Sequence, residues 1–153
     1  SIVGAKIGQP DVPVVGFAGD GAFGIAVNEL TAIGRGDWPA ITQIVFRNYQ
    51  WGAEKRNSTL WFDDNFVGTE LDTEVSYAGI AQACGLKGVA ARTMDELTDV
   101  LNTAIKDQME NNVTTLIEVM LNQELGDPFR RDAMKQPVRV AGISADDMVE
   151  QVV

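Results

Sequence analysis

Cysteine and positive charge are both scarce in this sequence. Its 153 residues include one cysteine, Cys84, and 12 Lys and Arg against 22 Asp and Glu, so the formal net charge is −10 and the pI about 4.3. A single cysteine cannot form an internal disulfide, which fits a reducing compartment, and we expect a cytoplasmic location. The acidic balance disfavours nucleic acid and anionic membrane surfaces as partners, because both present negative phosphates.

Long apolar runs are also absent. No stretch approaches the length that spans a membrane, and the first ten residues, SIVGAKIGQP, lack the layout of a signal peptide. The sequence has no initiator methionine and opens on what looks like the second half of a helix, so we expect a fragment of a longer protein. Its 45% of hydrophobic residues suffice for one globular core. We expect a folded domain over residues 1–123 and a carboxyl-terminal tail over residues 124–153.

A glycine-rich turn that contains one carboxylate is the strongest local feature. The uncharged block Val14–Ala18 predicts a buried parallel strand, and residues 24–33 predict a helix. The turn between them has the sequence Gly19-Asp20-Gly21-Ala22-Phe23. At the carboxyl end of a parallel strand, such a turn directs free backbone N–H groups and the positive end of the helix dipole at one point. The turn therefore predicts an anion site, and phosphate is the anion we expect.

The turn also satisfies the dinucleotide pattern GxGxxG from Gly19 onward, but two features argue against a nicotinamide or flavin. A dinucleotide-binding unit requires an acidic residue at the end of the next strand. Here that strand, predicted over residues 41–46, is followed by Arg47 and Asn48. In addition, Asp20 would repel a phosphate by about 4 kcal/mol per pair of unit charges roughly 4 Å apart. A divalent cation between them reverses the sign, so Asp20 indicates a diphosphate bound through Mg²⁺.

The spacing from Asp20 to Asn48 resembles the motif of the thiamine-diphosphate-dependent enzymes, which is Gly-Asp-Gly, some two dozen residues and then Asn-Asn. Asn48 follows Asp20 by 28 residues. The resemblance implies that the Asp20 carboxylate, the Asn48 side chain and the Gln50 backbone carbonyl bind the Mg²⁺ that holds the cofactor's diphosphate. Arg47 departs from the motif, because it stands where the first Asn is expected. That position is not a metal ligand in the family, so the role of Arg47 stays open.

The rest of the cofactor site is expected on either side of these ligands. Backbone N–H groups of Gly21, Ala22 and Phe23 would hold the diphosphate. Residues 49–72 combine many aromatic side chains with no clear period, so they form either a loop packed by its own aromatics or a cap over the cofactor that also meets a partner subunit. Trp51 and Gly52, near the start of this segment, are further candidates for contact with the cofactor.

The remaining pattern predicts an α/β fold with a doubly wound parallel sheet and helices on both faces. Strands are predicted over residues 87–91 and 115–120, and helices begin at about Thr73, with Asp72 as N-cap, and at a capping box over Thr93–Glu96. The glycine turn and Asn48 then meet at the carboxyl ends of neighbouring strands, where such sheets bind ligands. The resemblance implies the thiamine diphosphate-binding fold, truncated at its amino end.

A narrower resemblance covers nearly the whole chain. The segments NYQWGAEKRN from Asn48, LWFDDNFVGTEL and LGDPFRRDAMKQPV resemble the sulfoacetaldehyde acetyltransferases. This implies the carboxyl-terminal domain of an enzyme built like acetolactate synthase, which acts as a homodimer or homotetramer and converts sulfoacetaldehyde and phosphate to acetyl phosphate and sulfite. It implies no catalytic residue in this chain, because the carboxylate that activates the cofactor lies on the pyrimidine-binding domain of a second subunit. The chain alone is expected to be inactive.

Alternatives stay open for the tail and for the function. Arg130 and Arg131 are either a solvated pair or an anion clamp for the sulfonate or phosphate, since guanidinium forks suit such oxygens. One alternative function is a 2-oxoacid carboligase or decarboxylase of the acetolactate synthase type. The other is a non-catalytic nucleotide-binding module that uses GxGxxG.

Overall fold

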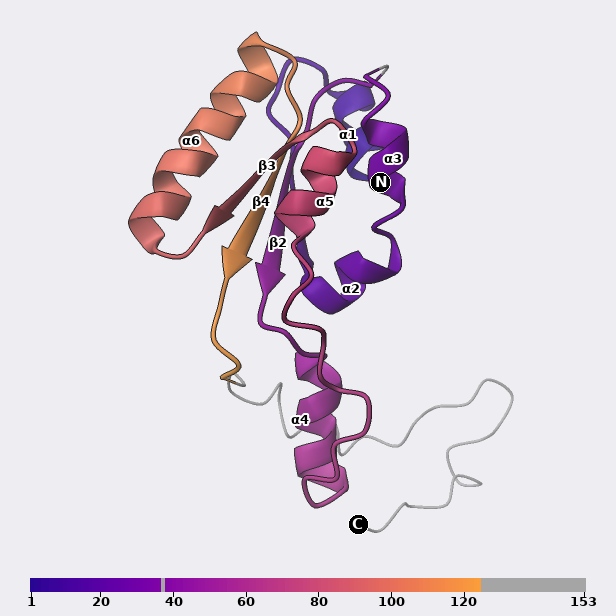
Figure 1. Ribbon diagram of the computed structural model, residues 1–153. Helices are drawn as coiled ribbons and strands as arrows, with labels where there is room; N and C mark the ends of the chain where they lie inside the picture. Colours follow the sequence, from indigo (N-terminus) through magenta and orange to yellow (C-terminus); the bar gives the residue numbers. More distant parts are fainter. Residues whose placement is uncertain (37, 125–153) are drawn as a thin grey trace, which may run out of the picture.

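Four parallel strands form the centre of the molecule (Figure 1). The computed structural model describes residues 1–36 and 38–124, with the elements α1 (Ile2–Gly8), β1 (Val15–Gly19), α2 (Asp20–Ile25), α3 (Glu29–Ile33), β2 (Thr42–Arg47), α4 (Gly52–Trp61), α5 (Tyr77–Ala83), β3 (Lys87–Ala91), α6 (Met94–Glu110) and β4 (Thr115–Met120). The strands pair in the order β1-β2-β4-β3, and every pairing is parallel. Within the described ranges, no helix is both long and apolar enough to cross a membrane.

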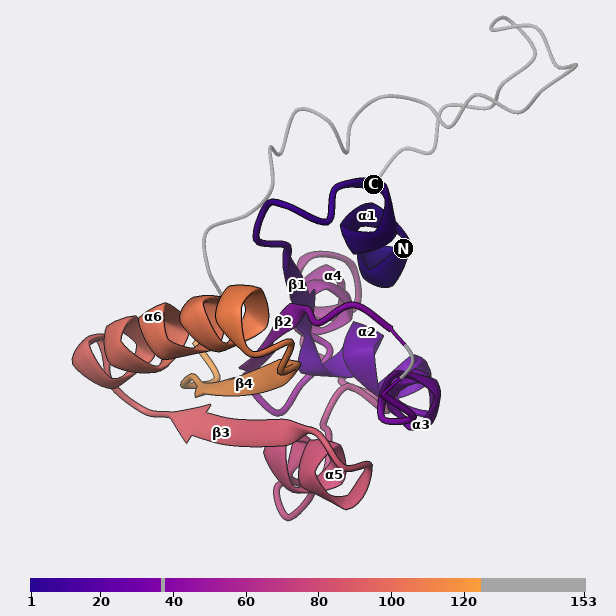
Figure 2. The ribbon, with the colours of Figure 1, turned by 90° about the horizontal axis from the view of Figure 1, so that it is seen from above.

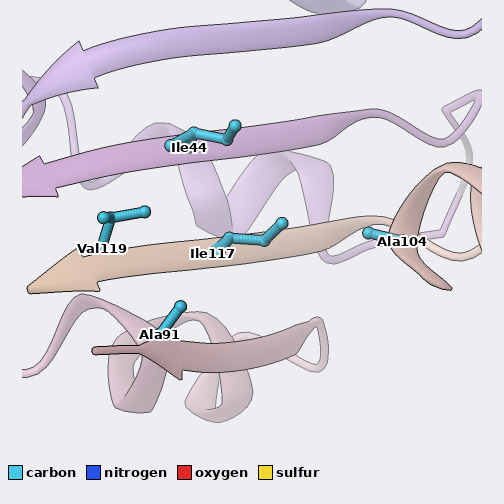
Figure 3. Packing of buried hydrophobic residues seen from close by; sticks show 5 residues of the cluster. All are labelled: Ile44, Ala91, Ala104, Ile117 and Val119. Atoms are coloured by element: carbon cyan, nitrogen blue, oxygen red, sulfur yellow. The ribbon is translucent and has the colours of Figure 1, made fainter. Parts of the chain in front are cut away.

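Helices cover both faces of this sheet, with α6 on one side and α5 on the other (Figure 2). Because successive residues of a strand point to opposite faces, the neighbours Ile44 and Val45 enter different cores. The core on the α6 face consists of Ile44, Ala91, Ala104, Ile117 and Val119 (Figure 3). The core on the α5 face consists of Leu30, Val45, Ala81 and Leu116. The predicted α/β fold with a parallel sheet and two helical layers is therefore confirmed.

The strongest periodic patterns were predicted accurately. β3 and β4 have the predicted bounds, and β1 and β2 each begin one residue later than expected. At the start of α6, the Thr93 hydroxyl accepts a hydrogen bond from the Glu96 N–H at 3.1 Å, as a capping box requires. The Glu96 carboxylate accepts from the N–H of Arg92 at 2.7 Å, one residue before the position that the motif predicts.

The single helix predicted over residues 24–33 is wrong. The chain instead forms two short helices: α2 already begins at Asp20, inside the expected turn, and α3 follows after a break. Two glycines in α2, Gly21 and Gly24, make a continuous helix unfavourable. Across the break the chain forms tighter turns, in which the Ala26 N–H donates to the Phe23 carbonyl at 3.0 Å.

Residues 49–72 were expected to be irregular, but they contain α4. Its sequence, GAEKRNSTLW, has no apolar stripe, so hydrophobic periodicity gives no signal for a helix there. Hydrogen bonds at its ends support it: the Lys55 N–H donates to the Trp51 carbonyl at 2.8 Å, and the Phe62 N–H donates to the Ser58 carbonyl at 2.9 Å. The Lys55 ammonium also pairs with the Glu70 carboxylate at 2.5 Å.

The predicted start of α5 is also wrong by four residues. Asp72 does not cap the helix; its carboxylate accepts from the Glu74 N–H at 2.7 Å in a preceding turn. The N-cap is Ser76, whose hydroxyl accepts from the Gly79 N–H at 3.0 Å. Both residues are good caps, and the sequence alone did not discriminate between them.

Close backbone contact between α5 and β3 depends on one glycine, and this generates a first prediction. A β-carbon added at Gly88 would collide with the backbone carbonyl of Ala78. Gly88→Ala should therefore lower the free energy of unfolding by about 1–3 kcal/mol, as overpacking does, when measured by urea denaturation.

The matched control is Gly4→Ala in α1, where an added β-carbon meets nothing within 4 Å. This change should raise the free energy of unfolding by about 0.4–1 kcal/mol, because it restricts the unfolded chain at a helical position. Equal effects of the two substitutions would contradict the steric explanation.

Candidate functional site

A cavity lies at the carboxyl ends of β1 and β2, beside the first turn of α4. Figure 1 shows that α4 extends beyond this end of the sheet. Its volume is about 370 Å³. It is lined by Gly19, Asp20, Gly21, Ala22, Phe46, Asn48, Gln50, Trp51, Gly52, Ala53, Glu54 and Leu121. Eight of the nine residues predicted for the cofactor are in this lining, and the ninth, Phe23, is not. The fold therefore brings together two segments that lie about 30 residues apart in the sequence.

Three oxygen-bearing groups converge in this lining. One terminal atom of the Asn48 amide lies 3.0 Å from the Gln50 backbone carbonyl oxygen and 3.3 Å from Asp20 Oδ1. With its nitrogen in that place, Asn48 donates a hydrogen bond to each of the other two groups. With the amide oxygen of Asn48 in that place, three oxygen atoms lie close together: one from the Asp20 carboxylate, one from the Asn48 amide and one from the Gln50 backbone carbonyl. That set is the ligand chemistry of a hard divalent cation.

Asp20 joins the two segments of the site. Its carboxylate is 3% exposed; Oδ2 accepts from the Tyr49 N–H at 2.7 Å, and Oδ1 accepts from the Gly21 N–H at 3.0 Å. One carboxylate thus ties the end of β1 to the segment after β2. The Gly21 N–H, expected to face the diphosphate, is directed at Asp20 instead.

A left-handed residue makes this convergence possible. Tyr49 has φ of 60°, a conformation that bulky side chains rarely adopt. It stands between Asn48 and Gln50 and turns the chain so that the amide of one and the carbonyl of the other reach the same point. Its own carbonyl accepts from the Leu71 N–H at 2.8 Å, which fixes the turn from the far side.

The two glycines of the turn differ in what occupies the space beside them. A β-carbon at Gly21 would stand 2.9 Å from the Trp51 indole, so the packing of Trp51 already requires glycine there. A β-carbon at Gly19 would meet nothing within 4 Å, although Gly19 lines the cavity. No contact in the described residues therefore explains glycine at position 19.

Phe23 has a structural role rather than a place in the cavity. Its ring meets Tyr77 edge to face, with centroids 5.5 Å apart. The Tyr77 hydroxyl donates to the Asp20 backbone carbonyl at 3.0 Å. Burial, and then the nearby Asp20 charge, raise the pKa of Tyr77, in keeping with a protonated hydroxyl that donates this bond. Sequence reasoning missed this link to the site.

Sequence reasoning also missed a buried ion pair behind the cavity. Arg47 Nη1 lies 2.6 Å from Glu118 Oε1, and the two residues are 4% and 1% exposed. The second carboxylate oxygen, Oε2, accepts from the Ser76 hydroxyl at 3.0 Å and the Ala78 N–H at 3.1 Å. A carboxylate between the apolar residues of the strand TLIEVM was the available signal, since a buried charge needs a partner.

The predicted family can now be tested. The family described as "Thiamine pyrophosphate enzyme, C-terminal TPP binding domain" matches residues 1–119. The chain belongs to this family. Thiamine pyrophosphate is thiamine diphosphate, so the match confirms the resemblance that the Asp20 to Asn48 spacing indicated. It favours this cofactor over the nucleotide-binding alternative.

Individual relatives of this TPP-binding domain are similar over its whole length. It is 80% identical, over 153 residues, to "Sulfoacetaldehyde acetyltransferase" of Roseovarius nubinhibens, and 74% identical, over 151 residues, to the protein of the same name from Rhodobacter capsulatus. These matches cover 100% and 99% of this chain but 25% of each relative. The chain therefore spans about a quarter of the length of the curated relatives it matches.

The fold has close counterparts among solved structures. The TPP-binding domain superposes on the crystal structure of benzoylformate decarboxylase from Polynucleobacter necessarius with a TM-score of 0.67 and 26% identity. The match covers 82% of this chain and 22% of the decarboxylase chain. This similarity confirms the thiamine diphosphate-binding fold that we predicted.

Other predicted features lie away from the cavity. Among the aromatic residues expected to cap a cofactor, Trp51 lines the cavity, whereas Trp61, Phe62 and Phe66 are exposed around the far end of α4. Arg130 and Arg131, predicted for a substrate anion, lie outside the described residues.

The Glu118 environment generates a prediction for acid stability. Burial would raise the pKa of Glu118, but hydrogen bonds from the Ala78 N–H, Arg47 and Ser76 outweigh it and hold that pKa below its usual value of 4.5. A carboxylate with a lowered folded-state pKa adds stability above its unfolded pKa and loses it as the pH falls through the folded pKa. The contribution of Glu118 should therefore decline below about pH 4.5.

Urea denaturation across this pH range measures the effect. Glu118→Gln should be less stable than the parent at neutral pH, by about 3–5 kcal/mol, because Arg47 is left buried without its partner charge. The difference should narrow as the pH falls below 4.5. A difference that stays constant down to about pH 3 would contradict the assignment.

Proposed function

We propose that this chain is the cofactor-anchoring domain of a sulfoacetaldehyde acetyltransferase, which converts sulfoacetaldehyde and phosphate to acetyl phosphate and sulfite. The observation that carries the proposal is 80% identity, over all 153 residues, to a protein of that name. Because the chain spans a quarter of that relative, the activity belongs to the whole protein and this domain supplies part of its site.

Mg²⁺ is the metal we propose, held by Asp20, Asn48 and Gln50. In support, these residues direct a carboxylate, an amide and a carbonyl at one point, and Mg²⁺ takes hard oxygen ligands in this way. Three protein ligands leave room in an octahedral shell for diphosphate oxygens and water. Among the described residues, no group of three or more His, Cys, Asp or Glu side chains is placed to hold a metal ion. The oxygen set of Asp20, Asn48 and Gln50 is therefore the candidate metal site that we propose.

The cofactor's diphosphate would lie in the cavity beside the glycine turn. Gly19 supports this placement. A side chain at this position would clash with no protein atom, but it would enter the cavity and occupy space that a ligand needs. Trp51 packs on Gly21 and forms a wall of the cavity. Gly52 and the backbone N–H groups of Ala22 and Phe23 complete the proposed contacts.

Thiamine diphosphate, when bound, would supply the nucleophilic carbon that activates the aldehyde. The residues of this domain would bind and orient it: Asp20 accepts from the Tyr49 N–H and would also hold the metal, so it would not be free to act as a general base. We therefore propose that the activating carboxylate comes from the pyrimidine-binding domain of a second subunit, in a homodimer or homotetramer. The exposed aromatics Trp61, Phe62 and Phe66 support a partner contact near α4. A cytoplasmic location is proposed from the single cysteine.

Product release from the full-length protein tests this function. With thiamine diphosphate and Mg²⁺ present, sulfite and acetyl phosphate should appear from sulfoacetaldehyde and phosphate. Asp20→Asn should reduce the rate at subsaturating Mg²⁺ by more than about 100-fold, since loss of a direct ligand costs more than the 10–100-fold typical of outer partners.

Asp99→Asn on the exposed face of α6 is the control, because it makes the same chemical change away from the cavity. Pyruvate is assayed in parallel. Consumption of pyruvate without sulfite release would replace the proposed activity with that of a carboligase of the acetolactate synthase type.

The tail arginines form a separate proposal. If Arg130 or Arg131 binds the sulfonate or the phosphate, its replacement by Ala should raise the KM for that anion about tenfold or more, because a hydrogen bond to a charged group contributes about 1.5–3 kcal/mol. Steady-state kinetics with each substrate varied in turn would measure this. Lys106→Ala removes an exposed cation of α6 and serves as control. Unchanged constants in both arginine variants would end the proposal.

A further inference from the structure

We propose that Arg47 is a positioning residue: it holds the left-handed turn at Tyr49 in the conformation that aims Asn48 and Gln50 at the proposed metal. This inference rests on the proposed function, because it concerns the same metal site. It assigns a role to the residue that departs from the Asn-Asn motif.

The contacts of Arg47 occupy three sides of its guanidinium. Nη1 pairs with Glu118 at 2.6 Å, and Nη2 donates to the Thr73 backbone carbonyl at 2.8 Å. The guanidinium carbon, Cζ, lies over the Tyr49 ring, 4.6 Å from its centroid. Arg47 thus connects β2, the segment before α5, and the turn that carries the metal ligands.

The contact with the Tyr49 ring connects Arg47 to the turn that carries the proposed metal ligands. A tyrosine with φ of 60° persists only where its surroundings hold it there. Its N–H and carbonyl are fixed by Asp20 and Leu71, and Arg47 fixes its ring. A planar guanidinium can stack and form two directed hydrogen bonds at once, which a lysine ammonium cannot.

Glu118 extends the same support to the other half of the site. Its Oε2 binds the Ser76 hydroxyl and the Ala78 N–H, which places the start of α5. Tyr77 lies between these two residues, and its hydroxyl donates to the Asp20 carbonyl at 3.0 Å. The ion pair therefore supports Asp20 through Tyr77, and Asn48 and Gln50 through Tyr49.

Arg47 itself is not among the residues that line the cavity, so it acts through its neighbours and not as a ligand. Partners that orient metal ligands in this way typically change metal affinity by about 10–100-fold when they are removed. The same range is expected here.

Mn²⁺ binding to the full-length protein, followed by electron paramagnetic resonance with thiamine diphosphate present, tests the inference without relying on turnover. The double variant Arg47→Met with Glu118→Gln removes both charges and the cation over the Tyr49 ring, and leaves an acceptor for Ser76 and Ala78. Arg47→Lys keeps the charge for Glu118, but one ammonium cannot keep the ring contact and both directed hydrogen bonds at once. Both should raise the Mn²⁺ dissociation constant at least about tenfold.

Lys6→Met is the matched control. Lys6 is also a buried cation, bound to the carbonyls of Pro10 and Val12 ahead of β1, at the opposite end of the strand from the cavity. It should lower the thermal midpoint without changing the Mn²⁺ dissociation constant. If the double variant does not fold, the Mn²⁺ dissociation constant of the more conservative variant Arg47→Lys still tests the inference.

The outcomes separate the inference from the proposed function. Unchanged Mn²⁺ affinity in a folded Arg47→Lys variant, or equal weakening by Lys6→Met, would overturn the positioning role while the metal site stands. Failure of the unaltered protein to bind Mn²⁺ in the presence of thiamine diphosphate would instead overturn the metal site, and this inference with it.

Discussion

A single buried carboxylate holds the candidate site together. Asp20 sits at the end of β1 and accepts a hydrogen bond from the Tyr49 N–H beyond the end of β2. The parallel pairing of β1 with β2 sets Gly19 beside Phe46, which brings the two strand ends within reach of one side chain. The positions of Asn48, Gln50 and the glycine turn follow from this contact. It also explains why a polar side chain can be buried here, because its acceptors are satisfied by backbone N–H groups.

Much of the fold follows from local sequence signals. β3 and β4 were predicted with their bounds, and α6 with its start, because apolar patterns there agree with breaks and with the capping box. α4 was missed because a helix with little apolar surface leaves no periodic trace, and its supporting contacts come from Trp51 and Glu70 outside it. The division of the helix after Asp20 was missed because glycine propensity and tertiary packing, rather than hydrophobic pattern, decide it.

The candidate site, like the fold, could be predicted only in part from the sequence. Asp20, Asn48 and Gln50 could be predicted together because the family motif fixes their spacing, and parallel topology then brings them close to one another. Glu118 and Tyr77 could not be assigned from spacing, because they reach the site through side chains from distant strands and helices. Arg47 was noticed only as a departure from the motif. The unusual carboxylate in β4 and the unusual cation at the end of β2 lie on adjacent strands, so considering them together would have predicted their pairing.

The left-handed tyrosine has a consequence for how this sequence can change. A side chain with a β-carbon in that conformation costs about 1–2 kcal/mol per residue, and glycine would remove the cost. Glycine would also remove the ring beneath Arg47 and allow the turn that carries Asn48 and Gln50 to move. Relief of backbone strain therefore favours glycine at position 49, whereas the contact with Arg47 favours tyrosine. The strained residue is retained at the cost of backbone energy that the surrounding contacts offset.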